Sequence, residues 1–151
     1  GKKILKHFRN QKYGIIGLAG TNHLVNGTWW AIRESMHGIV NHTDGVKKWT
    51  SNFSADQGDK IKDMIVLDGL FIAVDRSKII HHFDEDFKGF HFYDLSFCFP
   101  NYLDGVDLGV ITDIRVTHMS IGETNDMWEE NKTLFENKYK GEFPITTDGN
   151  N

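Results

Sequence analysis

The fold is decided by the run Met64-Ile65-Val66-Leu67-Asp68-Gly69-Leu70-Phe71-Ile72-Ala73-Val74. A short apolar run of this kind predicts a strand that is buried on both faces of a sheet. The Asp68-Gly69 pair interrupts the run, and such an interruption is typical of a bend or bulge. We therefore expect a buried strand that ends in a carboxylate at the floor of a binding site.

A second apolar run, Tyr13–Gly20, predicts another buried strand, and its glycines allow a close approach of backbones. Between and beyond the two runs, the spacing of apolar residues predicts both helices and further strands. The expected helices are Lys2–Lys12, Lys78–His81, Phe92–Leu103 and a last one from Thr124 or Asn125 to Tyr139. The expected further strands are Trp29–Ile32, Gly38–Asn41, Lys47–Phe53 and Val110–His118. Buried strands separated by helices indicate an α/β fold.

Composition excludes several classes of protein. The chain has 151 residues with a net charge of -4, which gives no basic footprint for nucleic acid. No apolar run approaches the ~20 residues that a membrane-spanning helix needs. Cys98 is the single cysteine, so a disulfide within the chain and a cysteine-based zinc site are both excluded. A reducing compartment, the cytoplasm, is the simplest expectation.

Two residues are candidates for chemistry. Asp94 follows an aromatic cluster, and apolar surroundings raise a carboxylate pKa toward a value useful to a general base. The alternative is an aspartate that only satisfies backbone N–H groups at a helix start. His118 ends an expected strand, where it is a candidate metal ligand or acid–base group, although it could be structural. In open α/β sheets, ligands bind beyond the carboxyl ends of strands, where Asp68 and His118 are both expected.

Three other features are weighed in the same way. Asp68-Gly69 suits the floor of a binding site, or is a simple bend. Trp29 and Trp30 would point to opposite faces of an extended segment, so that one packs in the core and the other stacks on a sugar, or both lie in the core. His81-His82 with Asp84, Glu85 and Asp86 is rejected as a metal site, because consecutive residues rarely converge on one ion.

Five segments in this order resemble the glycosyltransferase-like family 2 group typified by the StrF domain. The resemblance covers about residues 13–139 and rests on their combination. The segments are Ile15-Ile16-Gly17-Leu18-Ala19-Gly20-Thr21, Asn26-Gly27-Thr28-Trp29-Trp30, Leu67–Val74, Phe83–Phe97 with its Tyr93-Asp94-Leu95, and Val116-Thr117-His118-Met119-Ser120-Ile121-Gly122.

The resemblance implies a GT-A-type sandwich that transfers a sugar from a nucleotide-sugar donor to a carbohydrate or other hydroxyl acceptor. A divalent cation, Mn²⁺ or Mg²⁺, would neutralise the diphosphate leaving group. Asp94 matches the position of the catalytic base. The segment departs from the commoner Glu-Asp form of the family, because His91 and Phe92 precede Tyr93. His118 matches a metal ligand. The resemblance implies substrate-binding roles for Trp29, Trp30, Asp68, Gly69, His91 and Tyr93, with Asp68 and Gly69 flooring the acceptor side.

One departure from the family pattern shapes the expectation. The Asp-x-Asp motif that grips metal and donor phosphates is not found before Tyr13. We therefore expect residues 1–140 to be a partial GT-A domain, incomplete at its amino-terminal side, and residues 141–151 to be a flexible tail. Such a piece would bind nucleotide sugars weakly and would leave the strand Tyr13–Ala19 or Leu67–Val74 without a neighbour. An unpaired apolar strand recruits another chain, so pairing with a missing segment or homo-oligomerisation is expected.

Two other functions stay open from the sequence. The first is a non-catalytic carbohydrate-binding or interaction module, which the missing metal motif favours. The second is a metal-dependent hydrolase that uses His118 and Asp94.

Overall fold

The computed structural model describes residues 1–9, 12–53, 61–119 and 124–147. The helices are α1 (Lys2–Phe8), the short 3₁₀ turn η1 (Arg33–Ser35), α2 (Tyr93–Leu103) and α3 (Asp126–Lys138). The strands are β1 (Ile15–Gly17), β2 (Ala19–Thr21), β3 (His23–Leu24), β4 (Met36–Thr43), β5 (Lys48–Asn52), β6 (Lys62–Met64), β7 (Val66–Leu67), β8 (Ile72–Val74), β9 (Leu108–Val110), β10 (Thr117–His118) and β11 (Ile145–Thr146).

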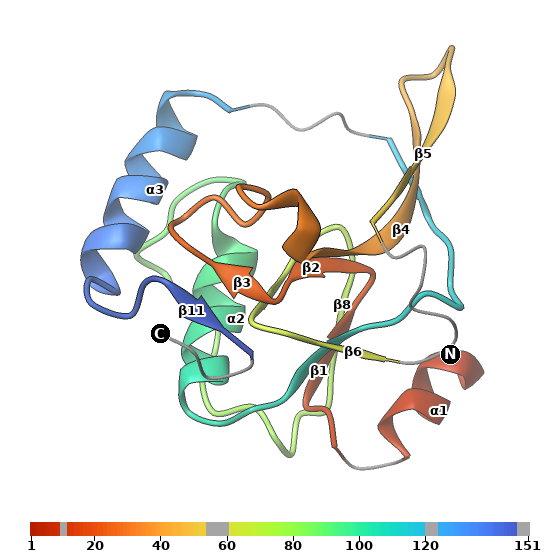
Figure 1. The fold of residues 1–151 in the computed structure, drawn as a ribbon, viewed down its shortest axis with the longest axis horizontal. Helices are drawn as coiled ribbons and strands as arrows, with labels where there is room; N and C mark the ends of the chain where they lie inside the picture. The colour runs from red at the N-terminus through yellow and green to blue at the C-terminus, as the bar shows by residue number, and fades with distance from the viewer. Residues whose placement is uncertain (10–11, 54–60, 120–123, 148–151) are drawn as a thin grey trace.

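The strands form three sheets of mixed direction. The first has the order β6-β9-β1-β8, and the second has the order β10-β4-β2-β7 with β5 paired to β4. β3 and β11 form a third, small antiparallel sheet. Figure 1 shows α2 and α3 on one side of the molecule, α1 at the other end, and the β4–β5 hairpin projecting beyond the sheets. The mixed α/β architecture agrees with the sequence prediction.

Each predicted apolar run is divided between sheets. Tyr13–Gly20 contains β1 and β2, which lie in different sheets and meet at the fully buried Leu18. Met64–Val74 contains the end of β6 and all of β7 and β8. The single strands expected there are therefore wrong. The prediction of burial on both faces holds for β1, β2 and β7, but β8 is half-buried and its Val74 is exposed. Ile15 belongs to the main hydrophobic core and Ile16 to a second cluster, which α1 helps to cover through Ile4 and Phe8.

The close backbone approach expected from the glycines occurs at Gly20. A Cβ on Gly20 would overlap the carbonyl oxygen of Val66 on the neighbouring β7. Because the overlapped atom belongs to the backbone of a buried strand, it cannot move aside cheaply. The small residue thus lets β2 and β7 lie together beside the site.

Several local predictions are corrected by side chains that bond to nearby backbone. Trp29–Ile32 is a turn instead of a strand, because the Asn26 side chain accepts from Thr28 N and Thr28 O accepts from Ala31 N. Lys78–His81 is not helical, and its backbone N–H groups at Ile80 and His81 donate to the Asn101 side chain.

Two further elements differ in extent from the predictions. The predicted strand Val110–His118 divides into the end of β9 and the short β10, and α1 ends at Phe8 before the predicted Lys12. By contrast, the strands expected at Gly38–Asn41 and Lys47–Phe53 are present as parts of β4 and β5.

The predicted tail contains ordered structure. β11 pairs with β3, and Thr147 N donates to Asn22 O. This corrects the expectation of a flexible tail for residues 145–147. It also places β3 within residues 22–27, whose polar sequence predicts a loop. Residues 148–151, and residues 54–60, whose polar sequence also predicts a loop, lie outside the described residues.

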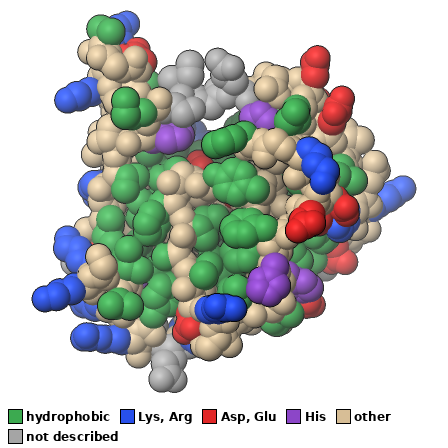
Figure 2. Space-filling model, turned by 180° about the vertical axis from the view of Figure 1, so that it is seen from behind, with side chains coloured by type: hydrophobic (Ala, Val, Ile, Leu, Met, Phe, Trp, Pro, Cys, Tyr) green, Lys and Arg blue, Asp and Glu red, His purple; other side chains and the backbone are tan. Residues whose placement is uncertain are grey.

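The sheet edges also differ from the expectation. β1 lies between β9 and β8, and β2 lies between β4 and β7, so neither half of Tyr13–Ala19 is an edge strand. Among the described residues, β7 and β8 each lie at the end of their sheet, within the run Leu67–Val74 that was the other candidate for an unpaired strand. Their pairing with a missing segment stays a prediction. Figure 2 shows hydrophobic side chains gathered across the middle of one face, with Lys and Arg mainly at its borders. Self-association through β8 stays a prediction. Within the described residues, no helix has the length and apolar character needed to span a membrane.

Candidate functional site

One cleft collects almost all of the residues that the sequence singled out. Its volume is about 570 Å³, within the range of roughly 300–1,000 Å³ that is usual for ligand pockets. Gly69 is the predicted residue that does not line it directly. The predicted residues on its surface are Trp29, Trp30, Asp68, His91, Tyr93, Asp94 and His118.

The second sheet explains why residues far apart in sequence meet here. β7 and β4 are both antiparallel to β2, and β10 is parallel to β4, so β7, β4 and β10 run in the same direction. Their carboxyl ends therefore lie at the same side of the sheet. Asp68 follows β7, His42 is near the end of β4, and His118 ends β10. The sheet position expected for Asp68 and His118 is thus observed.

The cleft floor, which we define as Asp68, Gly69, Tyr93 and Asp94, is held by hydrogen bonds between a turn and the start of α2. Gly69 N donates to Asp94 Oδ2 at 2.9 Å, and Tyr93 Oη donates to Gly69 O at 3.0 Å. Asp68 Oδ1 accepts from Leu70 N at 3.0 Å, which closes the turn. Both polar atoms of the Gly69 backbone are therefore bonded to consecutive residues of α2.

The close packing of Tyr93 against residue 69 requires a glycine at this position. A Cβ at this position would overlap the hydroxyl group and ring of Tyr93. The helix start is also unusual, because Phe92 has the left-handed φ of 67° that non-glycine residues rarely adopt. Such strained positions cluster at functional sites, where surrounding structure holds them. Phe92 is buried and packs on Trp128 and Phe135.

Electrostatics make Asp94 a weaker acid than an ordinary aspartate. Burial raises the pKa of Asp94 to about 6, and the nearby carboxylate of Asp68 adds to the rise. Burial also raises the pKa of Asp68. Asp94 Oδ1 accepts from Leu95 N, so the helix-start role considered from the sequence is also present. A carboxylate with a pKa near 6 is mostly ionised at pH 7 and accepts a proton readily.

The aromatic wall of the cleft, which we define as Trp29, Trp30, Phe92 and Trp128, comes from the segment after Gly27, the start of α2, and α3. Trp29 is 7% exposed and Trp30 is 43% exposed, so one packs in the core and the other faces the cleft. The Trp30 ring lies edge-on to Trp29 at 5.8 Å between centroids, and tilted against Trp128 at 5.7 Å.

Helix α3 positions the loops that carry the wall and the rim. Asn131, which is buried, donates from its side chain to the carbonyl oxygens of Lys88 and His91. Glu136 Oε1 accepts from Gly27 N at 3.0 Å, two residues before Trp29. The helix is capped by Asn125, whose side chain accepts from Trp128 N. This selects Asn125 over the alternative Thr124.

His118 has a histidine neighbour that the sequence did not indicate. His42 lies opposite His118 on β4, with ring centroids 5.8 Å apart, and its other face stacks on Trp49. Nδ1 of His42 is buried and has no hydrogen-bond partner among the described residues. Burial, followed by the charge of His118, lowers the pKa of His42.

The described residues fit a bound metal ion only in part. They contain no group of three His, Cys, Asp or Glu side chains placed to hold a metal. His118 and His42 offer two imidazoles, but this part of the chain does not assemble a complete set of ligands. We therefore derive no chemical step through a metal.

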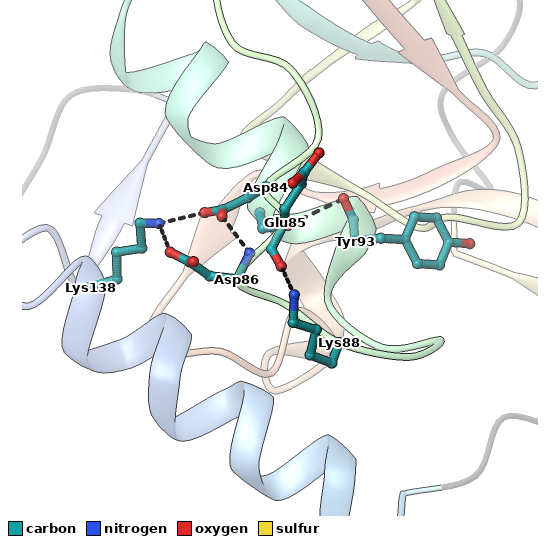
Figure 3. Close-up of polar contacts among 7 residues, drawn as sticks. Asp84, Glu85, Asp86, Lys88, Tyr93 and Lys138 are labelled. Carbon is teal, nitrogen blue, oxygen red and sulfur yellow. Dashed lines mark hydrogen bonds and ion pairs between the residues drawn. The ribbon is translucent and has the colours of Figure 1, made fainter.

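The acidic turn that was rejected as a metal site has structural partners. Lys138 of α3 pairs with Asp84 at 2.5 Å and with Asp86 at 3.3 Å, and His81 pairs with Asp104. Figure 3 shows Lys138 of α3 beside Asp84 and Asp86 of the loop that precedes α2, with the Tyr93 side chain pointing away from them. Asp84 and Asp86 thus tie this loop to α3.

Sequence reasoning missed His42, Phe90 and Trp128 as cleft residues. The helical spacing of Trp128, Phe135 and Tyr139 in the sequence predicts that Trp128 points inward, but it does not distinguish a core position from a cleft position. His42 could have been found only by knowing that β10 pairs with β4. Phe90 follows Gly89 in the segment before α2, and its exposure of 86% could not be predicted from the sequence pattern.

A cleft of this volume, lined by aromatic rings and a few polar groups, has the character of a small-molecule binding site. The model of the glycosyltransferase-like family matches residues 1–139. The chain therefore belongs to the glycosyltransferase-like family, and a general glycosyltransferase function follows. A comparison with curated proteins finds no match.

Proposed function

We propose that the protein transfers a sugar from a nucleotide-sugar donor to an acceptor hydroxyl, with Asp94 as the general base. The observation that carries the proposal is the Asp94 carboxylate in the cleft, held by Gly69 N and with a pKa raised to about 6. The family membership supports the reaction class. The StrF-type subgroup and the GT-A form of the fold are part of this proposal.

The reaction follows from these roles. The acceptor hydroxyl gives its proton to Asp94 as its oxygen bonds to the anomeric carbon of the donor sugar. The bond from that carbon to the diphosphate breaks, and the nucleoside diphosphate leaves. The Asp68 carboxyl group beside Asp94 raises the pKa of Asp94 and so increases its basicity. Gly69 and Tyr93 fix the direction of the Asp94 carboxylate through the two hydrogen bonds of the floor.

The test compares sugar transfer by the protein and by Asp94→Asn over panels of nucleotide sugars and hydroxyl acceptors. Chromatography of the glycosylated product and of the released nucleoside diphosphate provides the readout. Asp104→Asn is the matched control, because Asp104 lies at the other end of α2 and pairs with His81. Equal transfer by the protein and by Asp94→Asn would refute the role of Asp94.

The divalent cation, Mn²⁺ or Mg²⁺, stays a proposal that rests on His118. Titration with Mn²⁺ tests it, because a paramagnetic ion broadens NMR signals of nearby nuclei. We expect broadening of the His118 ring signals, which EDTA reverses and which His7 signals do not share. His7 is a suitable internal control, because it pairs with Asp113 beside α1. Uniform broadening, or none, would remove His118 from the metal site.

A second candidate function is a carbohydrate-binding module without catalysis. The specific observation in its favour is that the described residues bring an aromatic wall, but no three metal ligands, into the cleft. It predicts sugar binding that is unchanged in Asp94→Asn, with no transfer by either protein.

A further inference from the structure

The cleft joins an aromatic surface to carboxylates, and its described lining contains no lysine or arginine. The carboxyl groups of this lining belong to Asp68 and Asp94. Phosphate groups are normally held by Arg, Lys, metal ions or helix N-termini. Two carboxylates instead repel a diphosphate. The charge of this lining therefore suits a neutral ligand.

A lysine in contact with the aromatic wall is already engaged. Lys132 lies over the Trp128 ring at 5.9 Å and pairs with Glu136 at 3.3 Å. Glu136 in turn accepts from Gly27 N. These contacts hold the lysine against Trp128 and Glu136, and it is not among the described residues that line the cleft.

The wall presents a preformed aromatic surface. Trp30 is partly exposed and lies between Trp29 and Trp128, and Phe92 supports Trp128 at 5.7 Å between centroids. Because these rings are packed before a ligand arrives, little side-chain freedom remains to be lost on binding. The face of an indole ring is electron-rich, and the C–H groups along one face of a pyranose ring carry partial positive charge. The two surfaces match in both shape and charge.

The floor supplies the hydrogen bonds that a sugar also needs. The carboxylates of Asp68 and Asp94 line the same cleft as Trp30 and Trp128. Ionised carboxylates accept hydrogen bonds from hydroxyl groups, and these bonds are stronger than those between neutral groups. A ring stacked on the wall can thus direct a hydroxyl toward Asp94.

We infer that the cleft binds a neutral pyranose as the acceptor, stacked on Trp30 and Trp128 with its hydroxyls toward Asp68 and Asp94. That the bound sugar is the acceptor rests on the proposed function. The inference narrows the acceptor from any hydroxyl compound to an uncharged sugar. Trp128 of α3 becomes a substrate-binding residue, which the family resemblance did not supply.

The test uses tryptophan indole N–H signals in NMR spectra of the protein without any donor. The chain has four tryptophans, and Trp49 is not part of the cleft lining. The probes are the methyl glycosides of glucose, galactose, mannose and N-acetylglucosamine, with inorganic pyrophosphate for comparison. We expect saturable shifts of the Trp30 and Trp128 signals with at least one glycoside, and a much smaller shift for Trp49.

Substitutions sharpen the same test. Trp30→Ala should weaken glycoside binding about five- to tenfold, as expected for a lost aromatic stacking contact. Trp49→Phe is the matched control, because Trp49 is similarly exposed, at 40%, but lies on β5. It should leave the affinity unchanged. The wild-type spectra decide the question even if a variant does not fold.

The outcomes separate this inference from the proposed function. No shift with any glycoside, shifts with pyrophosphate alone, or equal weakening by Trp30→Ala and Trp49→Phe would overturn the inference. Sugar binding at the wall without any transfer would support it while refuting catalysis. Transfer to a non-sugar hydroxyl, without glycoside binding, would overturn it while leaving the proposed function intact.

Discussion

The cleft floor is held by hydrogen bonds, and the aromatic wall is held by ring contacts. At the floor, the N–H and C=O of Gly69 are bonded to Asp94 and Tyr93, so the direction of one carboxylate is fixed. At the wall, Trp29 is buried and Trp30 presents part of its surface to the cleft. Directional bonds suit a group that must accept a proton along one line, and broad ring surfaces suit binding.

The two regions also differ in how they respond to change. Hydrogen-bond partners at the floor are replaceable only by groups of the same shape and polarity, because an unpaired buried group is costly. The wall tolerates changes on its exposed side better than in its buried support, since cavities form only where side chains are enclosed. Substitutions in each region therefore test whether the floor carries chemistry and the wall carries binding.

The largest expected effect is on catalysis at the floor. Asp94→Asn keeps the shape of the side chain but cannot accept a proton, so we expect transfer to fall by about 10²–10⁴-fold. Glycoside binding at the wall should change by much less. Steady-state rates and NMR titrations on the same preparation measure the two effects. A comparable loss of binding and rate would show that floor and wall do not divide their roles as proposed.

The next effect is on stability and compares the buried Trp29 of the wall with the partly exposed Trp30. Trp29→Ala removes a buried ring and should lower the free energy of unfolding by about 3–5 kcal/mol. Trp30→Ala removes a partly exposed ring and should cost less than about 1.5 kcal/mol. Urea denaturation followed by circular dichroism measures both. Equal costs would mean that Trp30 is a core residue and not a free binding surface.

The sequence predicted the helices of this site better than its strands. Apolar spacing identified α2 and α3 because each is long enough for several turns to repeat the same buried face. The runs at residues 13–20 and 64–74 were read as single strands, since nothing in a short apolar run reveals where a chain changes sheet. The change at Leu18 depends on pairing partners that are distant in sequence.

The site residues show the same distinction. Asp68 and Gly69 were found because a polar residue and a glycine stand out in an apolar run, and the turn at Gly69 is closed locally by Leu70 N. Asp94 was found because it follows a cluster of aromatic residues, and because its segment resembles that of the glycosyltransferase-like family. His42 was missed because its place depends on the pairing of β4 with β10. Its chemical environment is a product of tertiary contacts and leaves no local pattern.

A smaller effect concerns the charge of the floor. The pKa of Asp94 in the fold is about 6, above its ordinary value of 3.8, so the folded protein binds this proton more tightly than the unfolded chain. The resulting stabilisation is complete below pH 3.8 and is lost as the pH rises to about 6. The asparagine side chain of the variant Asp94→Asn does not titrate. We expect wild-type stability to fall relative to Asp94→Asn by about 1–3 kcal/mol between about pH 4 and 7.

Urea denaturation of both proteins across this pH range provides the measurement. The difference between the two proteins removes the titration of distant groups, which both share. Asp68 remains in both, so its own proton uptake contributes mainly through its coupling to Asp94. A difference that stays constant across the range would mean that Asp94 has an ordinary pKa, and the floor would then lack a base tuned for neutral pH.

The smallest expected effect tests whether the Tyr93 hydroxyl helps to fix the direction of the Asp94 carboxylate. Tyr93→Phe removes the hydroxyl that donates to Gly69 O at 3.0 Å but keeps the ring that packs on Gly69. The expected cost is about 1 kcal/mol in the free energy of unfolding, the usual worth of one such bond. If Tyr93 also orients the turn that holds Asp94, the transfer rate should fall while the affinity for glycosides stays the same. Because the wall is untouched, a parallel loss of glycoside affinity would instead show that the turn supports both regions, and that the floor and the wall act as one unit.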